Sequence, residues 1–171
     1  MLNSLNKSYA NTITLLNIIF GTLSLIYTMH GYFSIAAVFI ILAVVMDGLD
    51  GRVARKLDIM SLLGKELDSL CDLVSFGVAP ALLIYAQVMN HFVFSLGVIA
   101  AVLYIVCGAY RLARFNVLNI SDYFVGIPIT MAGAIVAVIS LLAVWIPGNL
   151  ILAILMLLAL MMVSTFKVPK F

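Results

Sequence analysis

Four aspartates near the middle of the sequence form two regularly spaced pairs. Asp47 and Asp50 are three residues apart, and Asp68 and Asp72 are four residues apart. If both segments are helical, the members of each pair lie on one helix face. Four carboxylates in one place repel one another and resist ionisation unless a cation compensates their charge. Because hard divalent cations take oxygen ligands, the spacing predicts a divalent-metal site, with two metals bridged by shared carboxylates as one arrangement.

Salt bridges at a solvated edge of the molecule are a second interpretation of the acidic residues. The basic residues that lie near them in the sequence are Arg52, Arg55, Lys56 and Lys65. We prefer salt bridges for Asp58 and Glu66, which lie in the same stretch of chain. For the four aspartates we prefer metal binding, because loop salt bridges would not require matching helical spacing.

Small residues accompany the aspartates. Gly51 and Ala54 follow the first pair, and Gly64 lies one helical turn before Asp68. Their lack of bulk lets a ligand approach the backbone, although small residues also serve tight helix packing in membranes. Arg55, one turn beyond Gly51, is a residue type that holds phosphate. Metal ligands, small residues and an arginine together predict phosphoryl chemistry.

The composition predicts the elements that must position these residues. Of the 171 residues, 65% are hydrophobic and only 9% are charged, whereas a soluble domain carries about 25% charged residues. This excludes a soluble globular domain, and it also excludes a disordered chain, which needs the opposite composition. The chain is therefore predicted to be an integral membrane protein with no room for a separate soluble domain.

Apolar segments long enough for membrane spans recur along the chain. They cover residues 12–29, 33–54, 67–89, 92–113, 124–146 and 149–166. All nine lysines and arginines fall on one side of this six-span arrangement, and the positive-inside rule assigns that side to the cytoplasm. We predict a single all-α integral membrane domain, residues 1–171, with six transmembrane helices and both termini cytoplasmic. The four aspartates then lie at the cytoplasmic ends of the second and third spans.

The aspartates and small residues form one motif. It reads Asp47-x-x-Asp50-Gly51-x-x-Ala54-Arg55, then eight residues, then Gly64-x-x-x-Asp68-x-x-x-Asp72. It resembles the complete signature of the CDP-alcohol phosphotransferase family, whose members displace CMP from a CDP-linked donor with an alcohol. The resemblance implies two divalent ions, Mg²⁺ or Mn²⁺, with the ligands Asp47, Asp50, Asp68 and Asp72. It implies that Asp72 is also the general base. The residues it implies around cytidine and the phosphates are Gly51, Ala54, Arg55 and Gly64.

The start of the first span adds to the resemblance. Asn11-x-x-Thr14-x-x-Asn17 is similar to the opening of bacterial and archaeal phosphatidylserine synthases in this family, with Ala10 where proline is usual. Thr14 and Asn17 share a helix face, and we expect them to reach the CDP moiety. Helix capping and polar contact between helices are the alternative roles.

Three later segments resemble the same branch of the family. They are Phe76-Gly77-Val78-Ala79-Pro80-Ala81, Cys107-Gly108-x-x-Arg111-Leu112-x-Arg114-Phe115-Asn116 and Gly126-Ile127-Pro128. Arg111 and Arg114 are three residues apart on one helix face. We expect them to bind the carboxylate of serine or a phosphate of the lipid donor. The alternative is that both are ordinary positive-inside anchors.

The resemblance implies a membrane enzyme, bacterial or archaeal, whose active site faces the cytoplasm. Its expected reaction transfers a phosphatidyl group from CDP-diacylglycerol to the hydroxyl of L-serine and releases CMP. A homodimer surrounded by membrane lipids is expected, and no nucleic-acid partner. Glycerol 3-phosphate or an inositol phosphate is the alternative acceptor, and it would require a more basic pocket. An ion-coupled transporter is the alternative from another class, and it predicts acids near the bilayer midplane and broken helices in both halves.

Overall fold

The structure is a computed structural model that describes residues 2–57, 62–89, 94–118, 123–164 and 167–169. Within these ranges it describes only the backbone of residues 2–13, 50, 52–57, 62, 94–95, 118, 123–125 and 167–169. The helices in chain order are α1 (Leu2–Met29), α2 (Phe33–Leu57), α3 (Leu62–Asp72), the π-helix η1 (Leu73–Val78), α4 (Ala79–Gln87), α5 (Phe94–Leu118), α6 (Ile129–Leu141) and α7 (Gly148–Val163).

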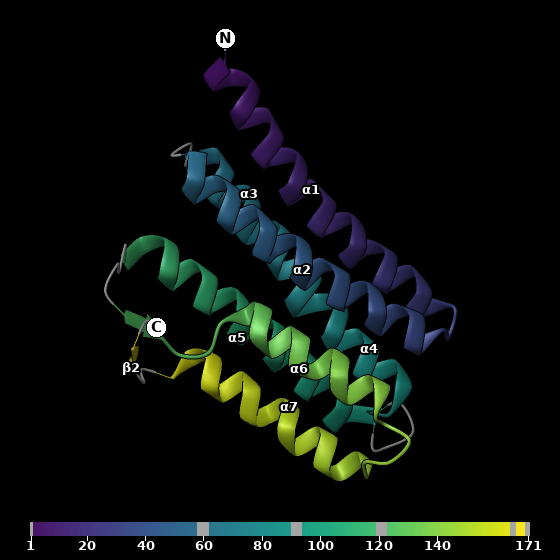
Figure 1. Cartoon of the computed structure of the whole chain (residues 1–171). Coiled ribbons are helices and arrows are strands. Elements are labelled where there is room, and N and C mark those ends of the chain that lie inside the picture. The colour runs from purple at the N-terminus through teal and green to yellow at the C-terminus, as the bar shows by residue number, and fades with distance from the viewer. Residues whose placement is uncertain (1, 58–61, 90–93, 119–122, 165–166, 170–171) are drawn as a thin grey trace.

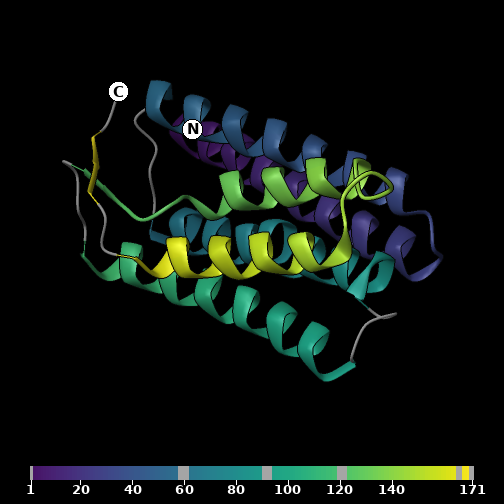
Figure 2. The ribbon, with the colours of Figure 1, turned by 90° about the horizontal axis from the view of Figure 1, so that it is seen from below.

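The helices form a bundle in which α3, η1 and α4 make one continuous segment. Helix α1 packs along α2, α2 along α6, and α5 along α7 (Figure 1). The α3–η1–α4 segment lies between the α1–α2 pair and α5, as the view from below shows (Figure 2). Within it, η1 contacts α1, α2, α5 and α6. The residues directly after Asp72 are therefore at the centre of the bundle.

A short two-stranded ribbon departs from the all-α prediction. Strand β1 (Tyr123–Val125) pairs antiparallel with β2 (Lys167–Pro169). The prediction extended a helix over 124–146, but Pro128 is the N-cap of α6, and the helix begins only at Ile129. At the other end α6 stops at Leu141, and turns cover residues 142–145 before Pro147. The apolar run is thus longer than the helix, because hydropathy does not report proline and turn geometry.

The helical segments suit an apolar environment. Two segments, Leu63–Gln87 and Leu96–Val117, are long and apolar enough to cross a membrane. The shorter apolar helices among the described residues are Thr14–Met29, Phe33–Leu49, Ile129–Leu141 and Gly148–Val163. Large hydrophobic side chains are exposed on all of these segments, as at Val106 and Leu160, which is what lipid contact requires. The number of spans and the side of the termini remain predictions.

Proline explains the π-helical turn. In a regular α-helix the N–H of residue 80 would bond to the carbonyl of Phe76, but Pro80 has no N–H and its ring would clash with that carbonyl. The N–H of Ala79 instead bonds to the carbonyl of Val74, five residues earlier. This wider turn lets the helical segment continue through Pro80. Pro80, within the Phe76–Ala81 segment, is the sequence signal for this turn.

Two glycines allow neighbouring helices to touch the backbone of η1. A Cβ atom on Gly133 of α6 would lie 2.8 Å from Cβ and 2.9 Å from Cα of Phe76. A Cβ atom on Gly21 of α1 would meet the side chain of Ser75 and lie 2.8 Å from its Cα. Small residues at such contacts are typical of helix packing in membranes. They hold η1 from two sides.

We expect Gly133→Ala to destabilise the protein by about 1–3 kcal/mol, because the added methyl group overpacks a contact with backbone that cannot yield easily. The matched control is Gly48→Ala, since nothing lies within 4 Å of a Cβ atom on Gly48 and alanine favours the helix. Thermal unfolding in detergent measures both variants. A melting temperature of Gly133→Ala equal to that of the wild type would contradict the close contact.

Candidate active site

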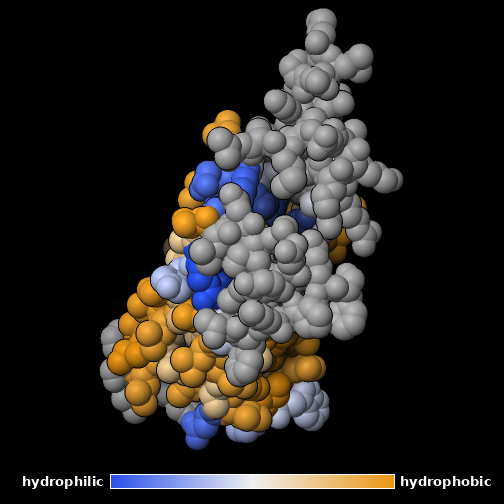
Figure 3. Space-filling model, turned by 90° about the vertical axis from the view of Figure 1, so that its left-hand side faces the viewer, coloured by the Kyte–Doolittle hydropathy of each residue, from blue (hydrophilic) through white to orange (hydrophobic). Residues whose placement is uncertain are grey.

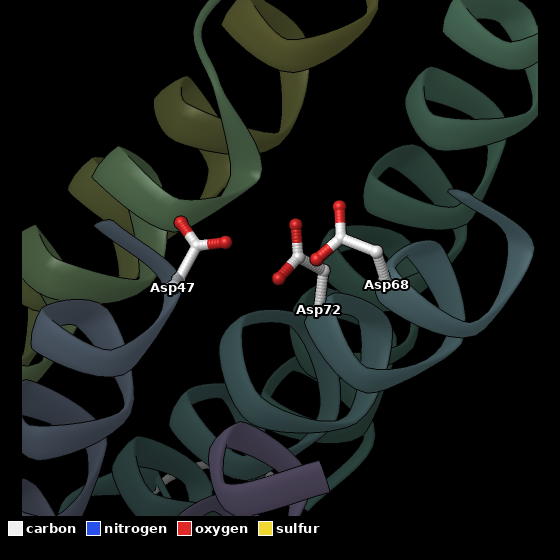
Figure 4. A group of neighbouring side chains, drawn as sticks. All are labelled: Asp47, Asp68 and Asp72. Carbon is white, nitrogen blue, oxygen red and sulfur yellow. The ribbon is translucent and has the colours of Figure 1, made fainter. Parts of the chain in front are cut away.

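Three of the four predicted aspartates lie together at one end of the bundle. One carboxylate oxygen from each of Asp47, Asp68 and Asp72 lies within 4.8 Å of the others. Asp47 projects from α2 toward the pair Asp68 and Asp72 on α3, so that the three carboxylates face a common space (Figure 4). Asp47 and Asp68 are half-buried, whereas Asp72 is only 7% exposed. The side chain of Asp50 lies outside the described residues.

Helix geometry explains how this group forms. Asp68 and Asp72 are four residues apart, so one face of α3 presents both. Helices α2 and α3 follow each other in the chain with only residues 58–61 between them, so the end of α2 and the start of α3 lie at the same end of the bundle (Figure 1). The aspartates of α2 and α3 can therefore meet, as the sequence predicted.

The charges and spacing of the group suit a hard divalent cation. Asp47 and Asp68 repel the negative charge of Asp72, while the Asn17 amide and the Arg111 guanidinium stabilise it. Oxygens that bind one cation at about 2.1–2.5 Å lie at most about 5 Å apart. The observed limit of 4.8 Å falls within this range. The donor set thus fits Mg²⁺ or Mn²⁺ chemically, and its three carboxylates carry the charge that such an ion would offset.

Helix α1 supplies a direct partner for Asp72. The side-chain amide of Asn17 donates a hydrogen bond of 3.1 Å to Oδ1 of Asp72. Ser75 of η1 donates a hydrogen bond of 3.1 Å from its hydroxyl to the backbone carbonyl of Asn17. Asn17 is fully buried, so water does not compete with either bond. The expected contact of Asn17 with the CDP moiety remains a prediction, and the structure adds a hydrogen bond from its amide nitrogen to the carboxylate that is the expected base.

We expect Asn17→Ala to lower kcat about tenfold. A hydrogen bond to a charged group is worth about 1.5–3 kcal/mol, and its loss frees the Asp72 carboxylate to turn away from its working direction. Steady-state CMP release measures kcat. The control is Thr22→Ala on the same helix, where the hydroxyl bonds only to the carbonyl of Ile18 one turn earlier, and kcat should stay within about twofold. An unchanged kcat in Asn17→Ala would contradict the orienting role.

The structure locates the other residues expected around CDP on the same helices. Thr14 is buried one turn before Asn17 on α1. Gly51 is exposed on α2, and Gly64 is half-buried on α3. The side chains of Ala54 and Arg55 lie outside the described residues. The CDP-binding roles of these five residues remain predictions.

The two arginines of α5 have different surroundings. Arg111 is 8% exposed, and its charge interacts with Asp72. Arg114 donates hydrogen bonds of 3.0 Å and 3.3 Å to the carbonyls of Val163 and Ser164 at the end of α7. Such carbonyls have no partner within their own helix, so Arg114 caps α7. This cap was not predicted, and the expected binding of the serine carboxylate or a lipid phosphate by Arg111 and Arg114 remains a prediction.

Asn116 is a further residue whose role sequence reasoning missed. Its side-chain amide donates a 3.0 Å hydrogen bond to Ser69 of α3, and its carbonyl accepts a 3.2 Å hydrogen bond from Lys65. These bonds fasten the end of α5 to the helix that carries Asp68 and Asp72. Figure 3 shows hydrophilic atoms gathered in the upper half of the molecule, above a largely hydrophobic surface.

Comparisons with known proteins agree with the motif. The sequence model of the family described as CDP-alcohol phosphatidyltransferase matches residues 7–165. A CDP-diacylglycerol–serine O-phosphatidyltransferase of Methanocaldococcus jannaschii is 45% identical over 161 residues, which cover 93% of this chain and 72% of the relative. An enzyme of the same name from Helicobacter pylori strain 26695 is 38% identical, with 95% and 72% covered. The one from Bacillus subtilis is 36% identical, with 93% and 88% covered.

Proposed function

Because the chain belongs to the CDP-alcohol phosphatidyltransferase family, we propose that it transfers a phosphatidyl group from CDP-diacylglycerol to the hydroxyl of L-serine. The products are phosphatidylserine and CMP. The observation that carries this proposal is the convergence of Asp47, Asp68 and Asp72 from two helices. Serine as the acceptor is supported by the names of relatives that are 36–45% identical over at least nine-tenths of the chain.

The proposed metal ligands are the four aspartates of the motif. Asp47, Asp68 and Asp72 hold a divalent cation, Mg²⁺ or Mn²⁺, and Asp50 completes the set for two ions. When bound, the metal neutralises charge on the phosphates of the donor. The absence of side chains at Gly51 and Gly64 leaves room for the donor phosphates beside the backbone. Ala54 and Thr14 line the cytidine side of the site, and Arg55 pairs with a phosphate.

The proposed chemistry assigns the proton to Asp72. The serine hydroxyl oxygen forms a bond to the phosphorus that bears diacylglycerol, and the bond from that phosphorus to CMP breaks. Asp72 accepts the hydroxyl proton as the new bond forms. The hydrogen bond from Asn17 occupies Oδ1 of Asp72 and so holds the carboxylate in one direction. Arg111, with its charge close to Asp72, binds the serine carboxylate or the lipid phosphate.

The proposed membrane arrangement follows from the charge distribution and the helices. The chain is one domain, residues 1–171, with six spans, and both termini and the active site face the cytoplasm. The continuous α3–η1–α4 segment supplies one span, and each of the helices α1, α2, α5, α6 and α7 supplies one. All nine basic residues then lie on the cytoplasmic side. We further propose that the protein works as a homodimer in the cell membrane.

The test is acceptor-dependent release of CMP. Purified protein in detergent, with CDP-diacylglycerol and Mg²⁺ or Mn²⁺, is given L-serine, glycerol 3-phosphate, an inositol phosphate or no acceptor. We expect CMP release to depend on serine. Release that depends only on a phosphorylated acceptor would overturn serine as the substrate, and no release with any acceptor would overturn the proposed reaction.

A further inference from the structure

The carbonyl of Phe76 lacks its normal helical partner. That partner would be the N–H of residue 80, and Pro80 has none. Phe76 is fully buried, and Gly133 of α6 presses against its backbone. A carbonyl in such a place is costly to leave without a donor, above all in a membrane protein, where neighbouring helices must satisfy the groups that a proline frees.

Tyr104 supplies the donor from another helix. Its hydroxyl, on α5, donates a hydrogen bond of 3.2 Å to the Phe76 carbonyl. Tyr104 is fully buried and is one of the largest buried side chains in the described core. A buried tyrosine normally finds a partner for its hydroxyl, and here that partner is the carbonyl that Pro80 leaves free. The bond therefore joins α5 to the middle of η1.

The shape of η1 determines how Asp72 is presented. Leu73, the first residue of η1, directly follows Asp72. If the π-helical turn reverted to an α-helix, the parts before and after it would rotate against each other by about 100°, the angle of one residue in an α-helix. The contacts of Ser75 with α1 and of Phe76 with α5 and α6 oppose this rotation. Asp72 consequently keeps its direction toward Asn17 and Asp47.

We propose that Tyr104 is a positioning residue, which acts through the Phe76 carbonyl and η1 to orient Asp72 for metal binding and proton transfer. The proposal rests on the proposed function for the role of Asp72. Tyr104 itself does not touch the carboxylates of the site. Its effect is on the geometry of the helical turn that carries the base.

The first test is Tyr104→Phe, which keeps the ring and removes only the hydroxyl. We expect kcat to fall about tenfold, while KM for serine stays within about twofold. We also expect the Mn²⁺ concentration that gives half of the metal-induced rise in melting temperature to increase severalfold. This second measurement needs no substrate and reports directly on the arrangement of the carboxylates.

The matched control is Ser140→Ala. Ser140 of α6 donates a 2.6 Å hydrogen bond to the side chain of Gln87 at the far end of α4. The substitution removes this hydrogen bond between α6 and α4, which lies away from η1. We expect a lower melting temperature with unchanged kcat and unchanged Mn²⁺ dependence. If Tyr104→Phe behaves in the same way, Tyr104 only stabilises the fold and the proposal is overturned.

A second variant tests the connection between Tyr104 and Pro80. Pro80→Ala restores an N–H that can bond to the Phe76 carbonyl within the helix. In that background, Tyr104→Phe should lower kcat and weaken the Mn²⁺ response less than it does alone. Independent, additive effects of the two substitutions would contradict the proposal. A wild-type protein without serine-dependent CMP release would instead overturn the proposed function, and the Mn²⁺ melting curves would still test Tyr104.

Discussion

Replacement of Asp72 by asparagine is expected to lower kcat for serine-dependent CMP release by about a thousandfold. A general base contributes about 10²–10⁴ in rate, and an amide can neither accept the proton nor match a carboxylate as a metal ligand. Asparagine has nearly the same shape, and its neutral side chain removes repulsion from Asp47 and Asp68. The protein should therefore remain folded. Initial rates at saturating serine and CDP-diacylglycerol, with a melting curve in detergent, measure both effects.

The control for this substitution is Glu66→Gln. Glu66 lies on the same helix, is exposed and stands outside the group of three carboxylates. Removal of its charge should change kcat less than about twofold. If Asp72→Asn retained a tenth or more of the wild-type kcat, Asp72 would not be the base, and another group would have to take the serine proton.

Removal of divalent metal is expected to reduce CMP release to the background rate, and Mg²⁺ or Mn²⁺ should restore it. Three carboxylates that share a space 4.8 Å across cannot hold the phosphates of CDP-diacylglycerol without positive charge between them. Dialysis against EDTA, followed by titration with each metal, measures the requirement. Full activity of protein that metal analysis shows to be free of divalent ions would refute the metal site.

Asp68→Asn should raise the metal concentration for half-maximal activity at least about tenfold. Removal of a residue that only hydrogen-bonds to a metal ligand costs about 10–100-fold in metal affinity or activity. Asp68 is proposed to bind the metal directly, so its removal should cost at least as much. Glu66→Gln again serves as the control on α3, with an unchanged metal requirement. If both variants shift the requirement equally, the effect is one of general surface charge, and Asp68 is not a ligand.

The helical segments could largely be predicted because hydropathy reports the apolar part of each helix. The predicted segment 33–54 corresponds to α2, and 149–166 corresponds to α7. The predicted helix ends are wrong where polar residues continue a helix or where a proline precedes it. Helix α3 begins at Leu62 and not at 67, because Gly64, Lys65 and Glu66 interrupt the apolar run and are still helical. Helix α6 is shorter than its apolar run because Pro128 precedes it.

The family and the meeting of Asp47, Asp68 and Asp72 could be predicted from the sequence, while their role as metal ligands remains a prediction. The motif is confirmed by the family match over residues 7–165. The spacing of Asp68 and Asp72 places them on one helix face, independently of the rest of the fold. The short connection between α2 and α3 keeps Asp47 at the same end of the bundle. These are local properties, because they depend on helix geometry and on neighbours in the chain.

The packing of the helices determines which groups distant in the sequence meet the aspartates and η1. The Asn17 amide reaches Asp72 across 55 residues of sequence, and the Tyr104 hydroxyl reaches the Phe76 carbonyl across 28. Arg114 likewise donates hydrogen bonds to the carbonyls of Val163 and Ser164 at the end of α7. Residue type shows that each group needs a hydrogen-bond partner, but the choice of partner depends on how the helices pack. The direction of Asp72 is therefore a property of the assembled bundle.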